Sequence, residues 1–160
     1  MNQKPFQFFW KGFCKYKNMI GFNVRIYGLL LNEQAQQILV SEEFICGRKI
    51  IKFPGGGLEF GEGIADCLKR EWKEELNQEI QIDQHFYTND FYQKSAWDES
   101  QVISMYYFVS LKNKVDFPID NGTEFFYFLP IADLDKKMGL PIDIIVAQKL
   151  MKTFITEVEK

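Results

Sequence analysis

An acidic helix that follows a run of glycines constrains this chain more than any other feature. Residues 53–80 read FPGGGLEFGEGIADCLKREWKEELNQEI, with seven acidic and three basic side chains between positions 59 and 79. Apolar residues recur at every fourth position of this segment, at Ile64, Leu68, Trp72 and Leu76. This spacing predicts an amphipathic helix over Ile64–Leu76, entered from a glycine-rich stretch.

The predicted helix carries three carboxylates on one side. At ~100° per residue with Ile64 at zero, Glu71 and Glu75 lie at about −20° and 20°, and Glu74 at about −80°. Glu75 therefore falls inside the apolar stripe, where a carboxylate is costly unless it is paired or binds a metal. Arg70 is expected to pair with one acid but not with three, so a hard cation such as Mg²⁺ would resolve the conflict. The alternative is a solvated helix face with Glu/Lys pairs.

The glycines before the helix can bring the backbone close to a ligand and to the helix start. They are Gly55, Gly56, Gly57, Gly61 and Gly63. They do not form a Walker loop, because no Lys-Ser/Thr pair follows them. They do not form G-x-G-x-x-G either, because Phe60 occupies the third glycine position.

One motif in this segment resembles the Nudix box, Gly-x5-Glu-x7-Arg-Glu-apolar-x-Glu-Glu-x-Gly-apolar. In this sequence it is Gly56-x5-Glu62-x7-Arg70-Glu71-Trp72-Lys73-Glu74-Glu75. Two positions depart from the box: Asn77 replaces the usual glycine and Gln78 the usual aliphatic residue. Asparagine is the next best residue for the left-handed conformation that ends a helix. Neither departure touches a carboxylate.

The rest of the chain is compatible with a Nudix fold. Strands are predicted at Asn23–Asn32, Gln37–Ser41, Arg48–Phe53, Glu79–Tyr92, Gln101–Leu111 and Glu124–Leu129, and a second helix at Asp143–Val158. Strands, helix, strands, helix is an order typical of α+β or α/β proteins with a mixed sheet and one core. The resemblance implies an α/β/α sandwich in one domain over residues 1–160, with the box as loop–helix–loop.

The resemblance also implies an activity, a Mg²⁺-dependent hydrolysis of pyrophosphate bonds with Mn²⁺ as a substitute. The substrate would be a nucleoside diphosphate linked to another moiety: a nucleotide sugar, ADP-ribose or a nucleoside triphosphate. The matching metal ligands are Glu71, Glu74, Glu75 and the Gly55 carbonyl, with Glu62 supporting the site through metal-bound water. Arg70 matches the arginine that orients these acids.

The general base is left open by the resemblance. In some relatives it is a box glutamate, which would be Glu71 here. In others it is an acid from a loop outside the box, for which the candidates are Asp98, Glu99, Asp120 and Glu124. Glu124 ranks first, because it opens a strand near where the family often carries such an acid. Aromatic side chains available to stack on a nucleobase are Phe22, Phe44, Tyr92 and Trp97.

Charge, hydropathy and residue usage exclude other classes of function. The net charge is 19 − 22 = −3 without a Lys/Arg-rich run, so duplex nucleic acid is not an expected partner. No apolar run approaches the ~20 residues that span a bilayer, so no membrane partner is expected. One histidine, His85, offers little for a catalytic dyad or a zinc site. The three cysteines lack a CxxC pair and are expected to be free thiols in a reducing cytoplasm.

The expected partner is a nucleotide-type small molecule. The alternative function is a catalytically silent Nudix-fold module that binds or senses a nucleotide, but the loss of catalysis should erase box acids, and all four are present. The amino-terminal segment is more apolar than a free terminus should be. We expect it to pack on its own domain or at a homodimer interface through Phe6, Phe8, Phe9, Trp10 and Phe13.

Overall fold

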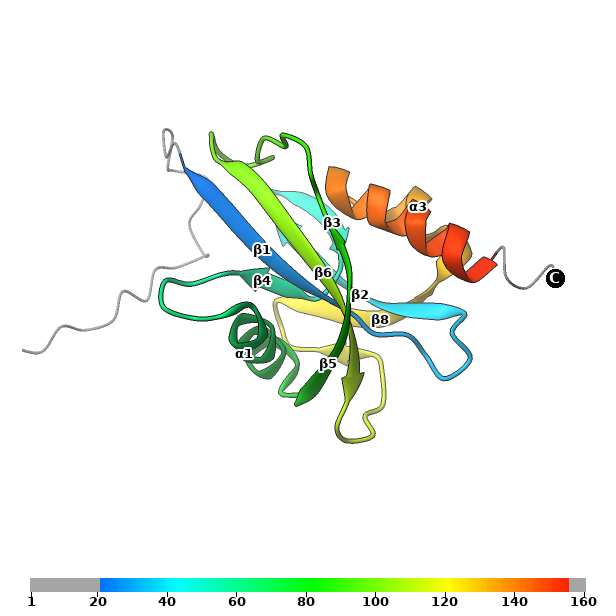
Figure 1. Ribbon diagram of the computed structural model, residues 1–160. Helices are drawn as coiled ribbons and strands as arrows, with labels where there is room; N and C mark the ends of the chain where they lie inside the picture. Colours follow the sequence, from blue (N-terminus) through cyan, green and yellow to red (C-terminus); the bar gives the residue numbers. More distant parts are fainter. Residues whose placement is uncertain (1–20, 156–160) are drawn as a thin grey trace, which may run out of the picture.

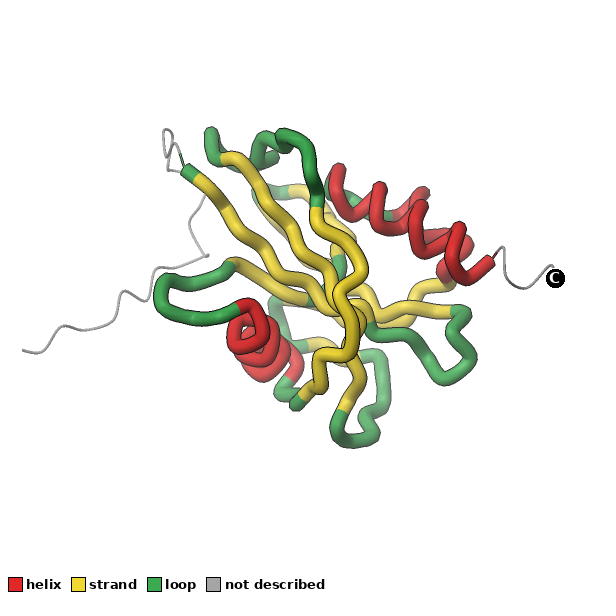
Figure 2. The backbone as a smooth tube through the Cα atoms, viewed as in Figure 1, coloured by secondary structure: helices red, strands yellow, loops and turns green. Residues whose placement is uncertain are grey.

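The strands of this protein form two four-stranded sheets in the computed structural model, which describes residues 21–155 (Figures 1 and 2). The first sheet has the order β4-β1-β6-β5 and the second the order β3-β2-β8-β7. The strands are β1 (Phe22–Leu29), β2 (Gln37–Ile45), β3 (Arg48–Lys52), β4 (Gly55–Gly57), β5 (Ile80–Thr88), β6 (Gln101–Leu111), β7 (Ile119–Asp120) and β8 (Glu124–Pro130). The helices are α1 (Ile64–Leu76), α2 (Leu134–Lys137) and α3 (Pro141–Ile155), with a 3-10 turn at Ile131–Asp133.

The first sheet is mixed, as the sequence predicted. Its β1 runs parallel to β6, whereas β4 pairs with β1 and β5 pairs with β6 in the antiparallel sense. The second sheet is antiparallel throughout. Figure 1 shows α1 and α3 on opposite sides of the strands. The layers are therefore helix, sheets, helix, which is the α/β/α arrangement expected.

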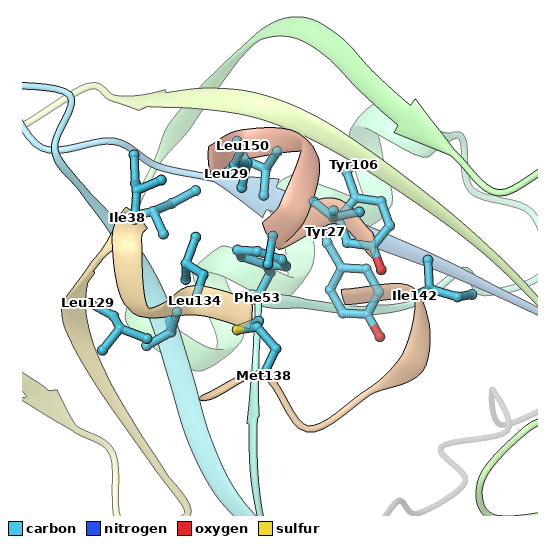
Figure 3. Close-up of a cluster of buried hydrophobic side chains, with 14 residues drawn as sticks. Tyr27, Leu29, Ile38, Phe53, Tyr106, Leu129, Leu134, Met138, Ile142 and Leu150 are labelled. Carbon is cyan, nitrogen blue, oxygen red and sulfur yellow. The ribbon is translucent and has the colours of Figure 1, made fainter. Parts of the chain in front are cut away.

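Side-chain alternation along the strands builds two hydrophobic clusters rather than the one core expected. Successive strand residues face opposite sides. In β1, Ile26 joins a cluster with Leu68 and Trp72 of α1. Its neighbour Tyr27 joins the other cluster, which includes Leu150 of α3 and is shown in Figure 3. The helices α1 and α3 therefore pack in different clusters, α1 with Ile26 and α3 with Tyr27.

The predicted helices and strands agree best with the structure where apolar residues recur at a regular spacing. The helix at Ile64–Leu76 and the strand at Gln101–Leu111 have the predicted bounds, whereas α2 and the short β7 were not predicted. The glycines that were expected to form a loop instead make β4, with Gly56 opposite Ile26 of β1. Glycine is a weak strand former, so the sequence did not indicate this pairing.

Two predictions concern cysteines and the amino terminus. Cys67 is free, as predicted, and it is buried. Cys46 lies at the exposed turn between β2 and β3 and is disulfide-bonded, so the expectation of a free thiol there was wrong. An exposed hairpin tip leaves the thiol accessible to another cysteine. The aromatic segment over residues 6–13 and Cys14 lie outside the described residues. Within residues 21–155, no helix is long and apolar enough to cross a membrane.

Candidate active site

Arg70 lies at the centre of the acids that surround α1. Its Nε and Nη2 donate to the two carboxylate oxygens of Glu62 at 3.0 and 2.7 Å, and its Nη1 donates to Glu71 at 2.8 Å. Nη1 also contacts Glu74 at 3.3 Å, and Nη2 donates to the Gly57 carbonyl at 3.0 Å. Arg70 thus pairs with three acids, where the sequence led us to expect one. Its hydrogen bonds hold the pKa of Glu62 down to about 2.

Glu71 lies directly against Gly56 of β4. A Cβ built on Gly56 would fall 2.3 Å from the Glu71 carboxylate, so only glycine leaves room for that side chain. Burial raises the pKa of Glu71, although Arg70 opposes the shift. Gly56 and Arg70 therefore fix the position of a half-buried carboxylate from two sides.

We predict that two adjacent glycines fail in different ways when changed to alanine. In Gly56→Ala the new methyl group displaces the flexible Glu71 side chain, so kcat should fall on the order of 10–100-fold while the melting temperature changes little. In Gly55→Ala the methyl group meets the Ile26 backbone oxygen at 2.2 Å, and φ is +138°, so the fold itself is strained. Thermal melts and initial rates of both variants separate the two effects. A fully active Gly56→Ala enzyme would refute the role given to Glu71.

Among the described acids of α1, Glu75 is the one with a buried side-chain oxygen that lacks a hydrogen-bond partner. It lies on the buried side of α1, as the helical wheel predicted, and its Oε2 finds no hydrogen-bond partner among the described residues. Burial raises the pKa of Glu75 to about 8. The charge of Lys52 opposes this shift, whereas the charges of Glu124 and Glu71 add to it.

A buried ion cluster from the second sheet faces Glu75. The Nζ of Lys52 on β3 lies 2.7 Å from Glu43 on β2 and 2.9 Å from Glu124 on β8. Lys52 is only 4% exposed. Burial would lower its pKa, but the charges of Glu124, Glu75 and Glu43 raise it. Burial raises the pKa of Glu124 to about 7.

Sequence reasoning missed Lys52 and Glu43. A lysine is normally exposed, but Lys52 shares a strand face with the buried Ile50, two residues before it. This two-residue spacing from a buried strand residue is the sequence signal that could have identified Lys52 as buried. Arg25 on β1 was missed too: its Nε donates to the Tyr27 hydroxyl at 3.2 Å, and its charge acts on Glu71 and Glu75.

Burial and contacts distinguish Glu124 from the other loop candidates for the general base. Glu124 is buried and its charge acts on Glu75. The contacts of the others are local: Asp98 accepts from Ser100, Glu99 pairs with Lys94, and Asp120 accepts from the backbone of Gly122. Of the aromatic candidates for base stacking, Phe22, Phe44 and Tyr92 are exposed.

The donor chemistry of this site fits a hard divalent cation. Carboxylate oxygens are the ligands that Mg²⁺ prefers, and the buried Oε2 of Glu75 has no partner within residues 21–155. Within residues 21–155, no group of three or more Asp, Glu, His or Cys side chains is already gathered closely enough to hold a metal ion. Instead, Arg70 forms ion pairs with carboxylate oxygens of Glu62, Glu71 and Glu74.

Comparisons with known proteins agree with this arrangement. The family model described as the NUDIX domain matches residues 21–149. Among solved structures, MutT, studied from Aliivibrio salmonicida and Vibrio cholerae, has a TM-score of 0.64 at 20% identity over 83% of this chain and 99% of its own. The E. coli ORF135 protein has a TM-score of 0.66 at 13% identity, over 82% of this chain and 90% of its own.

A third solved structure is an ADP-ribose pyrophosphatase from Streptococcus suis, with a TM-score of 0.58 at 17% identity over 84% of this chain and 91% of its own. No curated protein sequence matches the chain. The comparisons confirm the expected family and fold and support the expected class of enzyme, a Nudix pyrophosphohydrolase. The chain therefore belongs to the NUDIX domain family.

Proposed function

We propose that this protein hydrolyses the pyrophosphate bond of a nucleoside diphosphate linked to another moiety, in a reaction that requires Mg²⁺. The observation that carries the proposal is Glu75: a half-buried carboxylate, whose buried Oε2 has no partner among the described residues, inside a family motif that supplies three further acids. A fold that only needed a stable helix gains nothing from this group, because burying a charge is costly unless it is paired or bound to a metal.

The proposed metal ligands are Glu71, Glu74, Glu75 and the Gly55 carbonyl, which together offer only hard oxygen donors. When bound there, a divalent cation neutralises phosphate oxygens and acidifies water. Arg70 holds Glu62 and Glu71 in fixed orientations through charge-assisted hydrogen bonds. Because Arg70 also contacts Glu74, the guanidinium sets the arrangement of three of the four box acids.

Glu124 is the proposed general base, with Glu71 as its rival. An effective base has a pKa near the working pH, and burial raises the pKa of Glu124 to about 7. Glu124 would accept the proton of the water that attacks a pyrophosphate phosphorus. Lys52, 2.9 Å from its Oε1, holds that carboxylate in place while the other oxygen, Oε2, has no partner among the described residues.

A panel of substrates tests this proposal. ADP-ribose belongs in the panel because one structural neighbour is named for cleaving it, together with nucleotide sugars and nucleoside triphosphates. With Mg²⁺ present, we expect at least one of these compounds to be hydrolysed. Binding of a nucleotide without turnover of any compound would instead favour a catalytically silent module.

A further inference from the structure

Two acids of the candidate site come from different parts of the fold. Glu75 lies in the last turn of α1, which packs against β4, β1 and β5 of the first sheet. Glu124 opens β8 in the second sheet. The charges of these two acids act on each other, so their separation matters to the site. The position of the helix end relative to the start of the strand therefore bears on the site.

The side chain of Asn121 makes that connection. Asn121 lies in the turn between β7 and β8, and its Nδ2 donates to the backbone carbonyl of Glu75 at 2.9 Å. Its Oδ1 accepts from the backbone N–H of Glu124 at 2.8 Å and from the N–H and hydroxyl of Thr123 at 2.9 and 2.8 Å. One carboxamide therefore contacts the backbones of both acidic residues.

The Glu75 carbonyl is free to accept this bond because it lies at the end of a helix, where the last carbonyls have no partner within the helix. Neighbouring carbonyls are satisfied locally. Asn77 N–H donates to the Lys73 carbonyl at 3.1 Å, and the Nε2 of Gln78 donates to the Leu76 carbonyl at 3.3 Å. At Glu75 the donor instead comes from the other sheet.

We propose that Asn121 is a positioning residue that sets Glu75 of the box helix against Glu124 of β8. This inference rests on the proposed function, since it assigns those two acids to the site. Asn121 is not a catalytic residue, because its contacts are with backbone groups and Thr123 rather than with reacting atoms. Its loss should loosen the acid pair and leave the two hydrophobic clusters intact.

The test compares Asn121→Asp with a matched control, Gln78→Met. Aspartate keeps the acceptor for Thr123 and Glu124 but removes the donor to Glu75, and it places a negative charge near the helix carboxyl end. Gln78→Met removes a similar amide-to-carbonyl bond at the same helix end, but one that does not reach β8. If the role of Asn121 is only to cap the helix, the two variants should behave alike.

We expect Asn121→Asp to lower kcat on the order of 10-fold, with KM little changed, and to weaken the calorimetric binding of Mn²⁺ alone by about 10-fold. Gln78→Met should retain both kcat and Mn²⁺ affinity. Asn121→Ser, which keeps a short hydroxyl in the turn, serves the same purpose if the aspartate variant does not fold.

Equal kcat and equal Mn²⁺ affinity in Asn121→Asp, Gln78→Met and the wild type would overturn the inference. The metal titration keeps this outcome distinct from failure of the proposed function. If the wild type hydrolyses no substrate, the proposed function fails, while the Mn²⁺ affinities of wild type and variant still decide whether Asn121 positions the acids. A wild type that binds no Mn²⁺ would overturn both.

Discussion

Glu75→Gln is expected to leave the protein nearly inactive and, without metal, at least as heat-stable as the wild type. Loss of a charged metal ligand should lower kcat on the order of 10²–10⁴-fold. The fold should survive because Oε2 of the carboxylate has no partner in the described part of the chain and its burial is unfavourable. A glutamine keeps the shape and removes the charge. Initial rates and metal-free melting temperatures of the same preparation measure both effects.

The stability gain of Glu75→Gln should depend on pH. Burial raises the folded-state pKa of Glu75 from 4.5 to about 8. The stability that the protonated group contributes is complete below pH 4.5 and is lost as the pH rises through about 8. The variant lacks this titration, so its metal-free melting temperature should exceed that of the wild type by more at pH 8 than at pH 5.

Glu79→Gln is the matched control for that variant. Glu79 follows the helix and makes an exposed pair with Lys112 at 3.5 Å, so its change should affect neither rate nor stability. A stable and fully active Glu75→Gln protein would favour the solvated-face interpretation of α1. An unfolded Glu75→Gln protein would show instead that a buried ion pair of Glu75 supports the fold.

Lys52→Met should destabilise the protein by about 3–5 kcal/mol at pH 8, because it leaves the buried Glu124 and the half-buried Glu43 without their cation. Loss of Lys52 raises the folded-state pKa of both acids. The stability of the variant should therefore fall as the pH rises through those values, and the difference from the wild type should shrink at pH 5, where the carboxyls take up protons. Chemical denaturation at the two pH values measures this.

Lys49→Met provides the comparison on the same strand. Lys49 pairs with Glu42 at 2.7 Å, but its side chain is 55% exposed, and exposed pairs contribute ~0–1 kcal/mol. If Lys52→Met and Lys49→Met cost the same small amount, the buried cluster does not have the energetic role described for it.

The Nudix box could be predicted from the sequence because its residues lie close together along the chain. The spacing of Leu68, Trp72 and Leu76 predicted both the bounds of α1 and the partial burial of Glu75 beside them. The family's fixed spacing then identified Arg70 and Glu62 without a structure. All these residues lie within one loop and one helix, where helical geometry alone determines which side chains meet.

The rest of the site depends on contacts between distant parts of the chain. Lys52, Glu43 and Glu124 belong to three strands whose order in the second sheet no local pattern indicates. The split into two sheets and the strand made by the glycines were missed for the same reason. The pairing of Arg70 with three acids also needs the loop that carries Glu62 to fold back over the helix.

The most direct test of the central claim is the initial rate of hydrolysis of the best panel substrate with Mg²⁺ and with excess EDTA. The proposed reaction requires a divalent cation bound by the oxygen donors of α1 and β4. The rate should therefore fall to background in EDTA and return when Mg²⁺ or Mn²⁺ is added beyond the chelator. Full activity in excess EDTA would contradict the account.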